Sequence, residues 1–322
     1  MSFRGEQRGR RRQARGVQLP SAPGRVAAII SLIVVAAVVF VILLDSGPDS
    51  SPHSAALTQA ALRPHAPART RTSQTVVQAG TASVPILVYH VINSQPAGST
   101  ALPALYVPAD QFQSQMQALK SRGWHAVTLN QLESYWTHGT SLGSGKPIVI
   151  TFDNGYASQY TNALPVLKAL GWAAVENLQL SGLSPSDGGL TDAQIRGLIA
   201  AGWELDTQGV NHTDLTALDS ATLSNDLTTA RQTMQSQYGV TPNWFSYPSG
   251  DYNSTVAAAV RAAGYTGATT VNQGWASPQA DRFRLPRLVV SAGTTPSQLL
   301  SQISAAQANT SVPPAYSGAG LA

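Results

Sequence analysis

Short apolar strands alternate with amphipathic helices along about 220 residues of this chain, from about Val84 to Ile303. Strands such as Pro147–Phe152 (PIVITF) are apolar on both faces, and helices such as Asp110–Arg122 (DQFQSQMQALKSR) carry apolar residues at helical spacing. Helices that alternate with wholly apolar strands are typical of a parallel sheet, either open or closed into a barrel. This part of the chain is therefore expected to fold as one α/β domain.

An uninterrupted apolar segment, Val26–Leu44, precedes that domain. Its nineteen residues contain no charge and no proline, and as a helix they span about 28 Å, close to the thickness of a bilayer core. Residues 1–25 hold seven arginines against one glutamate. The positive-inside rule then predicts a single-pass anchor in the cell membrane, with the N-terminus cytoplasmic and the domain extracytoplasmic. A cleaved signal peptide is the alternative, although its apolar region is usually shorter.

The net charge of +4 arises in the basic tail, because from residue 83 onward ten Lys and Arg face thirteen Asp and Glu. Nucleic acid is therefore not an expected partner. The absence of cysteine excludes disulfides and thiolate metal sites. Composition and periodicity together divide the chain into a cytoplasmic basic tail (1–25), a transmembrane anchor (26–44), a flexible linker (45–82), the α/β domain (83–303) and a disordered tail (304–322).

Polar residues follow several predicted strands, at the carboxyl ends where α/β folds usually place their chemistry. Asp153 and Asn154 come directly after PIVITF, and His90 ends PILVYH. A carboxylate at the end of a wholly apolar strand suits a general base or a ligand, and the alternative is an aspartate that caps the next helix. His212, with acidic residues nearby, is either a ligand or a loop residue that is satisfied by its neighbours.

Taken in order, these segments resemble the polysaccharide deacetylases, carbohydrate esterase family 4 with its NodB-homology domain. The resemblance runs through VPILVYHVI, PIVITFDNGYASQYTNALPVLKALGW, ELDTQGVNHTDL, WFSYPSGDYN and RLPRLVV. The YH and F-x-Y-P-x-G motifs are similar to those of the branch that acts on exopolysaccharides such as poly-N-acetylglucosamine. The resemblance implies a distorted (β/α)7 barrel and metal-assisted hydrolysis of N-acetyl groups on cell-wall or exopolysaccharide glycans, usually with zinc.

The same resemblance assigns Asp153 as the catalytic base and Asn154, Gln208 and His212 to the metal-ligand positions. Where the family has Asp, His and His, this chain has Asn, Gln and His, and amides are poor zinc donors. The family's arginine aligns with Ser246, and Arg287 lies near the missing general-acid motif, where it cannot donate a proton near neutral pH.

Further residues complete the expected site. Glu176, in a strand that should be apolar, is a candidate replacement ligand, although a salt-bridged position or a position at the rim would also explain it. The candidate substrate-binding residues are His90, Tyr247, Pro248, Ser249, Gly250 and, for stacking on a sugar, Trp275. Three functions remain open: an active deacetylase with a divalent metal, an inactive module that binds N-acetylated glycan without one, and a structural ectodomain.

Overall fold

The computed structural model describes residues 78–97, 103–183 and 188–307. The basic tail, the apolar segment Val26–Leu44 and nearly all of the predicted linker and C-terminal tail lie outside these ranges. Within them, none of the helices combines the length and the apolar character that a membrane crossing requires. The membrane anchor therefore remains a prediction.

One sheet organises the described part of the chain, with the strand order β7-β6-β5-β4-β3-β1-β8, β2 paired to β3 and β9 paired to β1. Every pairing is parallel except the short antiparallel contact of β1 with β8. The predicted α/β class is confirmed, in the form of an α/β half-barrel. The strands are β1 Val84–Tyr89, β2 Trp124–Val127, β3 Lys146–Asn154, β4 Val175–Leu178, β5 Glu204–Thr207, β6 Trp244–Ser246, β7 Gly267–Thr269, β8 Trp275–Ala276 and β9 Leu288–Val289.

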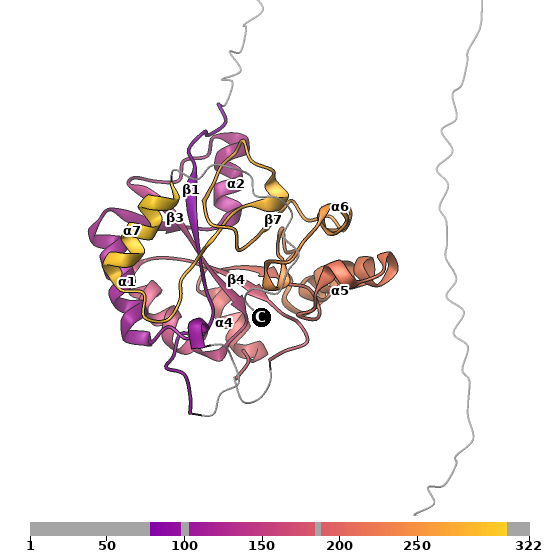
Figure 1. Cartoon of the computed structure of the whole chain (residues 1–322), viewed down its shortest axis with the longest axis horizontal. Helices are drawn as coiled ribbons and strands as arrows, with labels where there is room; N and C mark the ends of the chain where they lie inside the picture. The colour runs from indigo at the N-terminus through magenta and orange to yellow at the C-terminus, as the bar shows by residue number, and fades with distance from the viewer. Residues whose placement is uncertain (1–77, 98–102, 184–187, 308–322) are drawn as a thin grey trace, which may run out of the picture. The chain divides into compact units, whose positions relative to one another are not determined.

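Helices surround the central strands, and α7 lies beside α1 (Figure 1). Three of them begin with a capping box, in which a threonine and the glutamine three residues later satisfy each other's backbone N–H groups. The helices are α1 Ala109–Ser121, α2 Leu129–His138, α3 Leu164–Leu170 (entered through a π-helical turn, Gln159–Ala163), α4 Asp192–Ala200, α5 Ser220–Tyr238, α6 Ser254–Ala262 and α7 Pro296–Ala306.

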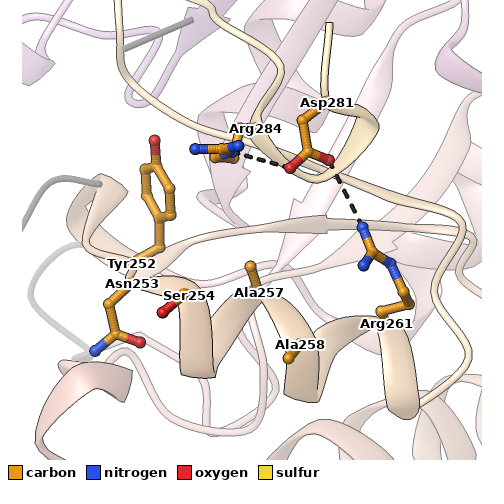
Figure 2. A pocket seen from close by; sticks show the side chains of 8 residues that line it. All are labelled: Tyr252, Asn253, Ser254, Ala257, Ala258, Arg261, Asp281 and Arg284. Atoms are coloured by element: carbon orange, nitrogen blue, oxygen red, sulfur yellow. Dashed lines mark hydrogen bonds and ion pairs between the residues drawn. The ribbon is translucent and has the colours of Figure 1, made fainter. Parts of the chain in front are cut away.

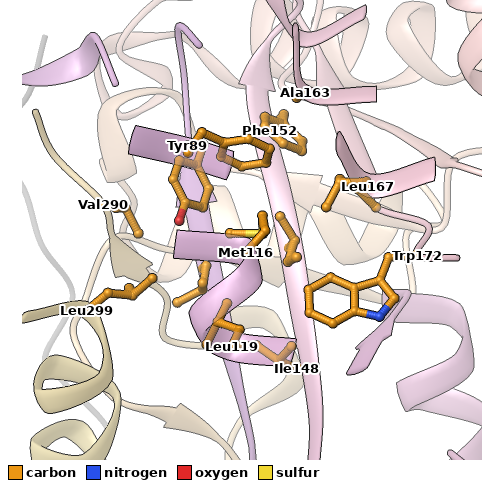
Figure 3. Packing of buried hydrophobic residues seen from close by; sticks show 14 of the residues in the cluster. Tyr89, Met116, Leu119, Ile148, Phe152, Ala163, Leu167, Trp172, Val290 and Leu299 are labelled. Atoms are coloured by element: carbon orange, nitrogen blue, oxygen red, sulfur yellow. The ribbon is translucent and has the colours of Figure 1, made fainter. Parts of the chain in front are cut away.

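Strand β3 explains how the core and the polar interior are separated. Ile148, Ile150 and Phe152 point to one face and join the large apolar cluster under α1, α3 and α7 (Figure 3). The alternate residues point inward, because successive side chains of a strand face opposite ways. Val149 joins an apolar cluster inside the half-barrel, and Asp153 follows on the same face of the strand. The strand therefore delivers one carboxylate into the interior at its carboxyl end.

A second acidic group lies inside the half-barrel, nearer the start of the strands. Glu204 Oε2 accepts a hydrogen bond from Asn130 N at the beginning of α2 (2.9 Å), and Asp206 Oδ1 accepts from the backbone N–H groups of residues 243 and 244. The two carboxyl groups lie close enough for each to act on the pKa of the other. Together they connect β5 to α2 and β6.

Both ends of the domain extend beyond the predicted limits. Gly80 N donates to Tyr135 O, and Trp136 Nε1 donates to Ala82 O, so the last residues of the predicted linker pack on α2. At the other end α7 continues to Ala306. Apolar periodicity places such boundaries only roughly, because single backbone contacts are invisible to it.

Candidate functional site

The carboxyl ends of several strands meet around Asp153, which is only 2% exposed. Asn177 Nδ2, from β4, donates to Asp153 Oδ1 (2.8 Å), and Gln208 Nε2, just after β5, donates to Oδ2 (3.1 Å). Ser246 Oγ, from β6, donates to Oδ2 as well (3.2 Å). Register places Asp153 beside Asn177, so neighbouring parallel strands bring these polar groups to one point.

Arg287 completes the group from a segment far along the chain. Its Nη1 and Nη2 donate to the two oxygens of Asp153, each at 2.8 Å, which makes a buried bidentate ion pair. The remaining donors reach Thr151 Oγ1, Ser246 Oγ and Thr270 O. All five N–H groups of the guanidinium are therefore satisfied. Ser246, which aligns with the family's arginine, also contacts Asp153, and Arg287 brings a guanidinium to this carboxylate from another segment.

The ion pair fixes the charge of Asp153. Burial alone would raise the pKa of this carboxyl group, but the charge and hydrogen bonds of Arg287 outweigh it, with help from His90 and Asn177. The pKa of Asp153 therefore lies below its ordinary value, and the group is ionised at neutral pH.

Two half-buried histidines lie near this carboxylate. Burial lowers the pKa of His90 to about 4, and the charges of Asp153, Arg287 and His212 all act on it. The pKa of His212 is lowered by burial too, against the opposing charges of Asp153 and Asp251. Both imidazoles are consequently neutral at neutral pH, and each has one ring nitrogen that donates and one that accepts.

The metal-ligand positions do not fit zinc. Asn154 and Gln208 offer only amide oxygens, and the Gln208 amide N–H is already used on Asp153. Asp153 itself is paired with Arg287. In the described ranges no three His, Cys, Asp or Glu side chains come together in a way that could hold a metal ion. His212 therefore stands as one zinc donor without the others that such a site needs.

Several predicted site residues lie elsewhere. Glu176 neighbours Asn177 on β4, so its side chain points to the opposite face from Asp153, where it is wholly buried. Trp275 pairs with Pro85 at the start of β1, the end of the sheet away from Asp153, and its Nε1 donates to Ile303 O. A replacement ligand and a sugar platform are therefore wrong for these two residues.

The loop after β6 is also less exposed than expected. The Tyr247 hydroxyl is buried and donates to Phe283 O, and Pro248 and Gly250 are buried. Ser249 is half-buried, with a positive φ of 53°. This loop shapes the wall of the site, and only Ser249 is available to a ligand.

Two pockets in the described part of the chain are lined by residues other than Asp153. One of about 240 Å³ lies between α6 and residues 281–284, where Asp281 pairs with both Arg261 and Arg284 (Figure 2). Another of about 250 Å³ has Asn154 at its edge and polar side chains from Gln179, Asp192 and Tyr238. The second pocket adjoins the strand ends and gives room beside the site.

Sequence reasoning missed the roles of Arg287 and Asn177. A signal for Arg287 was present, since an arginine inside the apolar run RLPRLVV must find a buried partner. The sequence does not say which carboxylate that partner is. Asn177 gave a weaker signal, as an amide in a strand that should be apolar, and its contact with Asp153 depends on the register of β4 against β3.

Comparison with known proteins matches this geometry to a family. Residues 142–268 match the family model described as polysaccharide deacetylase. YxkH of Bacillus subtilis (strain 168), provisionally named a polysaccharide deacetylase, is 28% identical over 212 residues, covering 66% of this chain and 73% of its own. The chain is thus similar to polysaccharide deacetylases over most of its described domain. The resemblance predicted from the sequence motifs is confirmed.

Solved structures of deacetylases share the fold. The Streptococcus pyogenes deacetylase PplD, in complex with acetate, superposes with a TM-score of 0.63 at 26% identity, covering 69% of this chain and 99% of that one. IcaB from Ammonifex degensii, at 21% identity, gives a TM-score of 0.57 over 70% of this chain and 97% of its own. A shorter match, 35% identity over 69 residues, links this chain to the poly-β-1,6-N-acetyl-D-glucosamine N-deacetylase of Escherichia coli K12, covering 21% of this chain and 10% of that enzyme.

Proposed function

We propose that this deacetylase-like domain binds N-acetylated polysaccharide at the site around Asp153 without hydrolysing it. The observation that carries the proposal is that hydrogen bonds occupy all the acceptor sites of the Asp153 carboxylate. Five hydrogen bonds, two from Arg287 and one each from Asn177, Gln208 and Ser246, occupy its oxygens. A carboxylate has about four lone-pair sites, so Asp153 has none left to accept a proton from an attacking water. Its lowered pKa also makes it a weak base.

The groups around Asp153 suit an acetamido sugar. An N-acetyl group presents one N–H donor and one carbonyl acceptor, and the neutral imidazoles of His90 and His212 supply both complements. The pocket beside Asn154 offers about 250 Å³ with polar walls for a neighbouring sugar. The Escherichia coli relative, whose name specifies poly-β-1,6-N-acetyl-D-glucosamine, supports this choice of glycan.

The proposal includes a location at the outer face of the cell membrane, supported by the apolar segment Val26–Leu44 and the arginines before it. Reporter fusions after residue 82 should be active only outside the cytoplasmic membrane, and the full-length chain should sediment with membranes. A soluble form trimmed near residues 45–56 would instead identify the segment as a cleaved signal peptide.

Hydrolysis of N-acetyl groups is the second candidate function. It is favoured by the retention of an ionised carboxylate at the family's base position, next to His90 and His212. Acetate release from N-acetylglucosamine oligomers, with and without added zinc, should be measured beside binding on the full-length protein. We expect binding without release, and Asp153→Asn should change the affinity by less than about threefold because the amide keeps the shape of the carboxylate. Release by the wild type that Asp153→Asn lowers by about 10²-fold or more would establish the enzyme instead.

The lost donors give a second test. The double substitution Asn154→Asp with Gln208→His restores a carboxylate and an imidazole beside His212, so zinc affinity should rise by several orders of magnitude, about 10³-fold or more. The measurement is a competitive zinc titration, with Asn177→Asp as a matched control that adds a carboxylate on the neighbouring strand. No gain by the double variant would mean that the scaffold holds these positions too far apart for a metal.

A further inference from the structure

An acidic residue in the middle of helix α5 stands out because its position calls for an apolar side chain. Asp226 lies between Leu223 and Leu227 on the buried stripe of the helix, and it is only 7% exposed. Aspartate is a poor residue for a helix interior, since it competes for backbone hydrogen bonds. In the described part of the chain, none of the ion pairs involves Asp226. Its carboxylate therefore needs another explanation.

The carboxylate faces the loop Gln208–His212, which carries two of the family's metal-ligand positions. Val210 N donates to Asp226 Oδ2 (3.1 Å), and both the backbone and the side chain of Asn211 also hydrogen-bond to this carboxylate. Hydrogen bonds from N–H groups to an ionised carboxylate are charge-assisted. Asp226 therefore holds the middle of the loop.

The other side of the loop is held by strand β4 and the residues that follow it. Gln208 N donates to Leu178 O (2.8 Å), Leu180 N donates to Gly209 O (3.2 Å), and Ser181 N donates to Val210 O (2.7 Å). The loop is thus fixed between backbone contacts on one side and a single side chain on the other.

Gly209 shows how closely the carboxylate approaches. Its φ is +93°, and a Cβ at this position would lie 2.5 Å from Asp226 Oδ2. Only glycine fits that conformation next to the carboxylate. The loop and helix α5 therefore approach each other closely at Gly209, three residues before His212.

We propose that Asp226 is a positioning residue that fixes the Gln208–His212 loop from the α5 side and sets the place of the His212 imidazole in the glycan site. The glycan part of this inference rests on the proposed function, whereas the loop contacts stand without it. Removal of the carboxylate leaves the β4 contacts in place, so the loop should remain folded but become more mobile at Val210–His212.

The test compares three variants of the full-length protein in detergent. Asp226→Ala should lower the affinity for a β-1,6-linked N-acetylglucosamine pentasaccharide about tenfold or more, since charge-assisted bonds are lost. It should also speed backbone hydrogen exchange in residues 208–212. Asp226→Asn keeps one acceptor oxygen, so it should lose only about threefold in affinity and show a smaller rise in exchange. Asp219→Ala, which removes the N-cap of the same helix, should lower the melting temperature without changing the affinity or the loop exchange.

Two results would overturn the positioning role of Asp226. One is backbone hydrogen exchange in residues 208–212 of Asp226→Ala that equals the wild type, and the other is an equal loss of glycan affinity in Asp226→Ala and Asp219→Ala. If Asp226→Ala does not fold, the exchange of Asp226→Asn decides, and exchange equal to the wild type overturns the proposal. If the wild type binds no oligomer, the proposed function fails, and the exchange measurements still test Asp226.

Discussion

Two clusters of carboxyl groups lie inside the same half-barrel and accommodate burial in opposite ways. Asp153 is ionised, because Arg287 neutralises it with a bidentate ion pair and holds its pKa low. None of the ion pairs in the described part of the chain involves Glu204 or Asp206, and burial raises both pKa values, with the charge of Glu204 adding to the rise at Asp206. The protonated form of each carboxyl group is therefore favoured. The difference teaches that a buried polar cluster does not by itself mark a functional site. The Asp153 cluster lies at the carboxyl ends of the strands, whereas Glu204 and Asp206 connect β5 to α2 and β6.

Removing the cation from the first cluster should have the largest effect. Arg287→Met leaves Asp153 buried without a partner, so we expect the free energy of unfolding to fall by about 3–5 kcal/mol. Urea denaturation measures the loss. Arg284→Met, which removes a partly exposed ion pair with Asp281, is the matched control and should cost less than about 1 kcal/mol. A second substitution, Asp153→Asn, should recover part of the loss in Arg287→Met. Equal losses for the two arginines would contradict the difference between the clusters.

The second cluster should reveal itself through pH. A carboxyl group with a raised folded pKa contributes stability that is fully present below its unfolded pKa, near pH 4, and is lost as the pH rises through the folded pKa. The wild type should therefore lose stability on the alkaline side, by up to about 1.4 kcal/mol per pH unit for one proton. Asp206→Asn should flatten that slope, measured by denaturant unfolding at a series of pH values. Parallel curves for the two proteins would show that the pKa of Asp206 is not raised in the folded protein.

The contribution of Asp153 to stability should depend on pH in the opposite direction, so one series of unfolding measurements distinguishes the two clusters. Its folded pKa is lowered, so its contribution is present above the unfolded pKa and is lost as the pH falls through the folded value. Asp153→Asn should therefore lower the stability at neutral pH and flatten the acidic limb of the stability profile, whereas Asp206→Asn should flatten the alkaline limb.

The smallest effect is expected at Glu176, on the other face of β4. Burial, and secondly the charge of Asp153, raise the pKa of Glu176, so the group is neutral at pH 7. Glu176→Gln replaces one neutral group with another and should change the free energy of unfolding by less than about 1 kcal/mol at this pH. A loss as large as that of Arg287→Met would mean that Glu176 is ionised and paired.

Much of the fold and part of the site follow from sequence patterns. The apolar run before Asp153 identifies both the strand and its carboxyl end, because periodicity and strand direction are local properties. Arg287 could be recognised only as a charge that needs a partner, since the ion pair joins segments 134 residues apart. The wrong expectations have similar causes. The face of the sheet on which the Glu176 side chain lies depends on strand register. The location of Trp275 depends on the antiparallel contact of β8 with the start of β1.

The distance along the chain between Asp153 and Arg287 also sets an order of assembly. During synthesis β3 emerges well before its cation, so a chain that stops short of residue 287 contains the carboxylate without the means to bury it. Contacts between such distant segments carry a high closure entropy and form late in folding. The N-terminal strands should therefore wait, with this end of the sheet still hydrated, until the last third of the domain arrives. Completion of the glycan site and completion of the fold then become the same event.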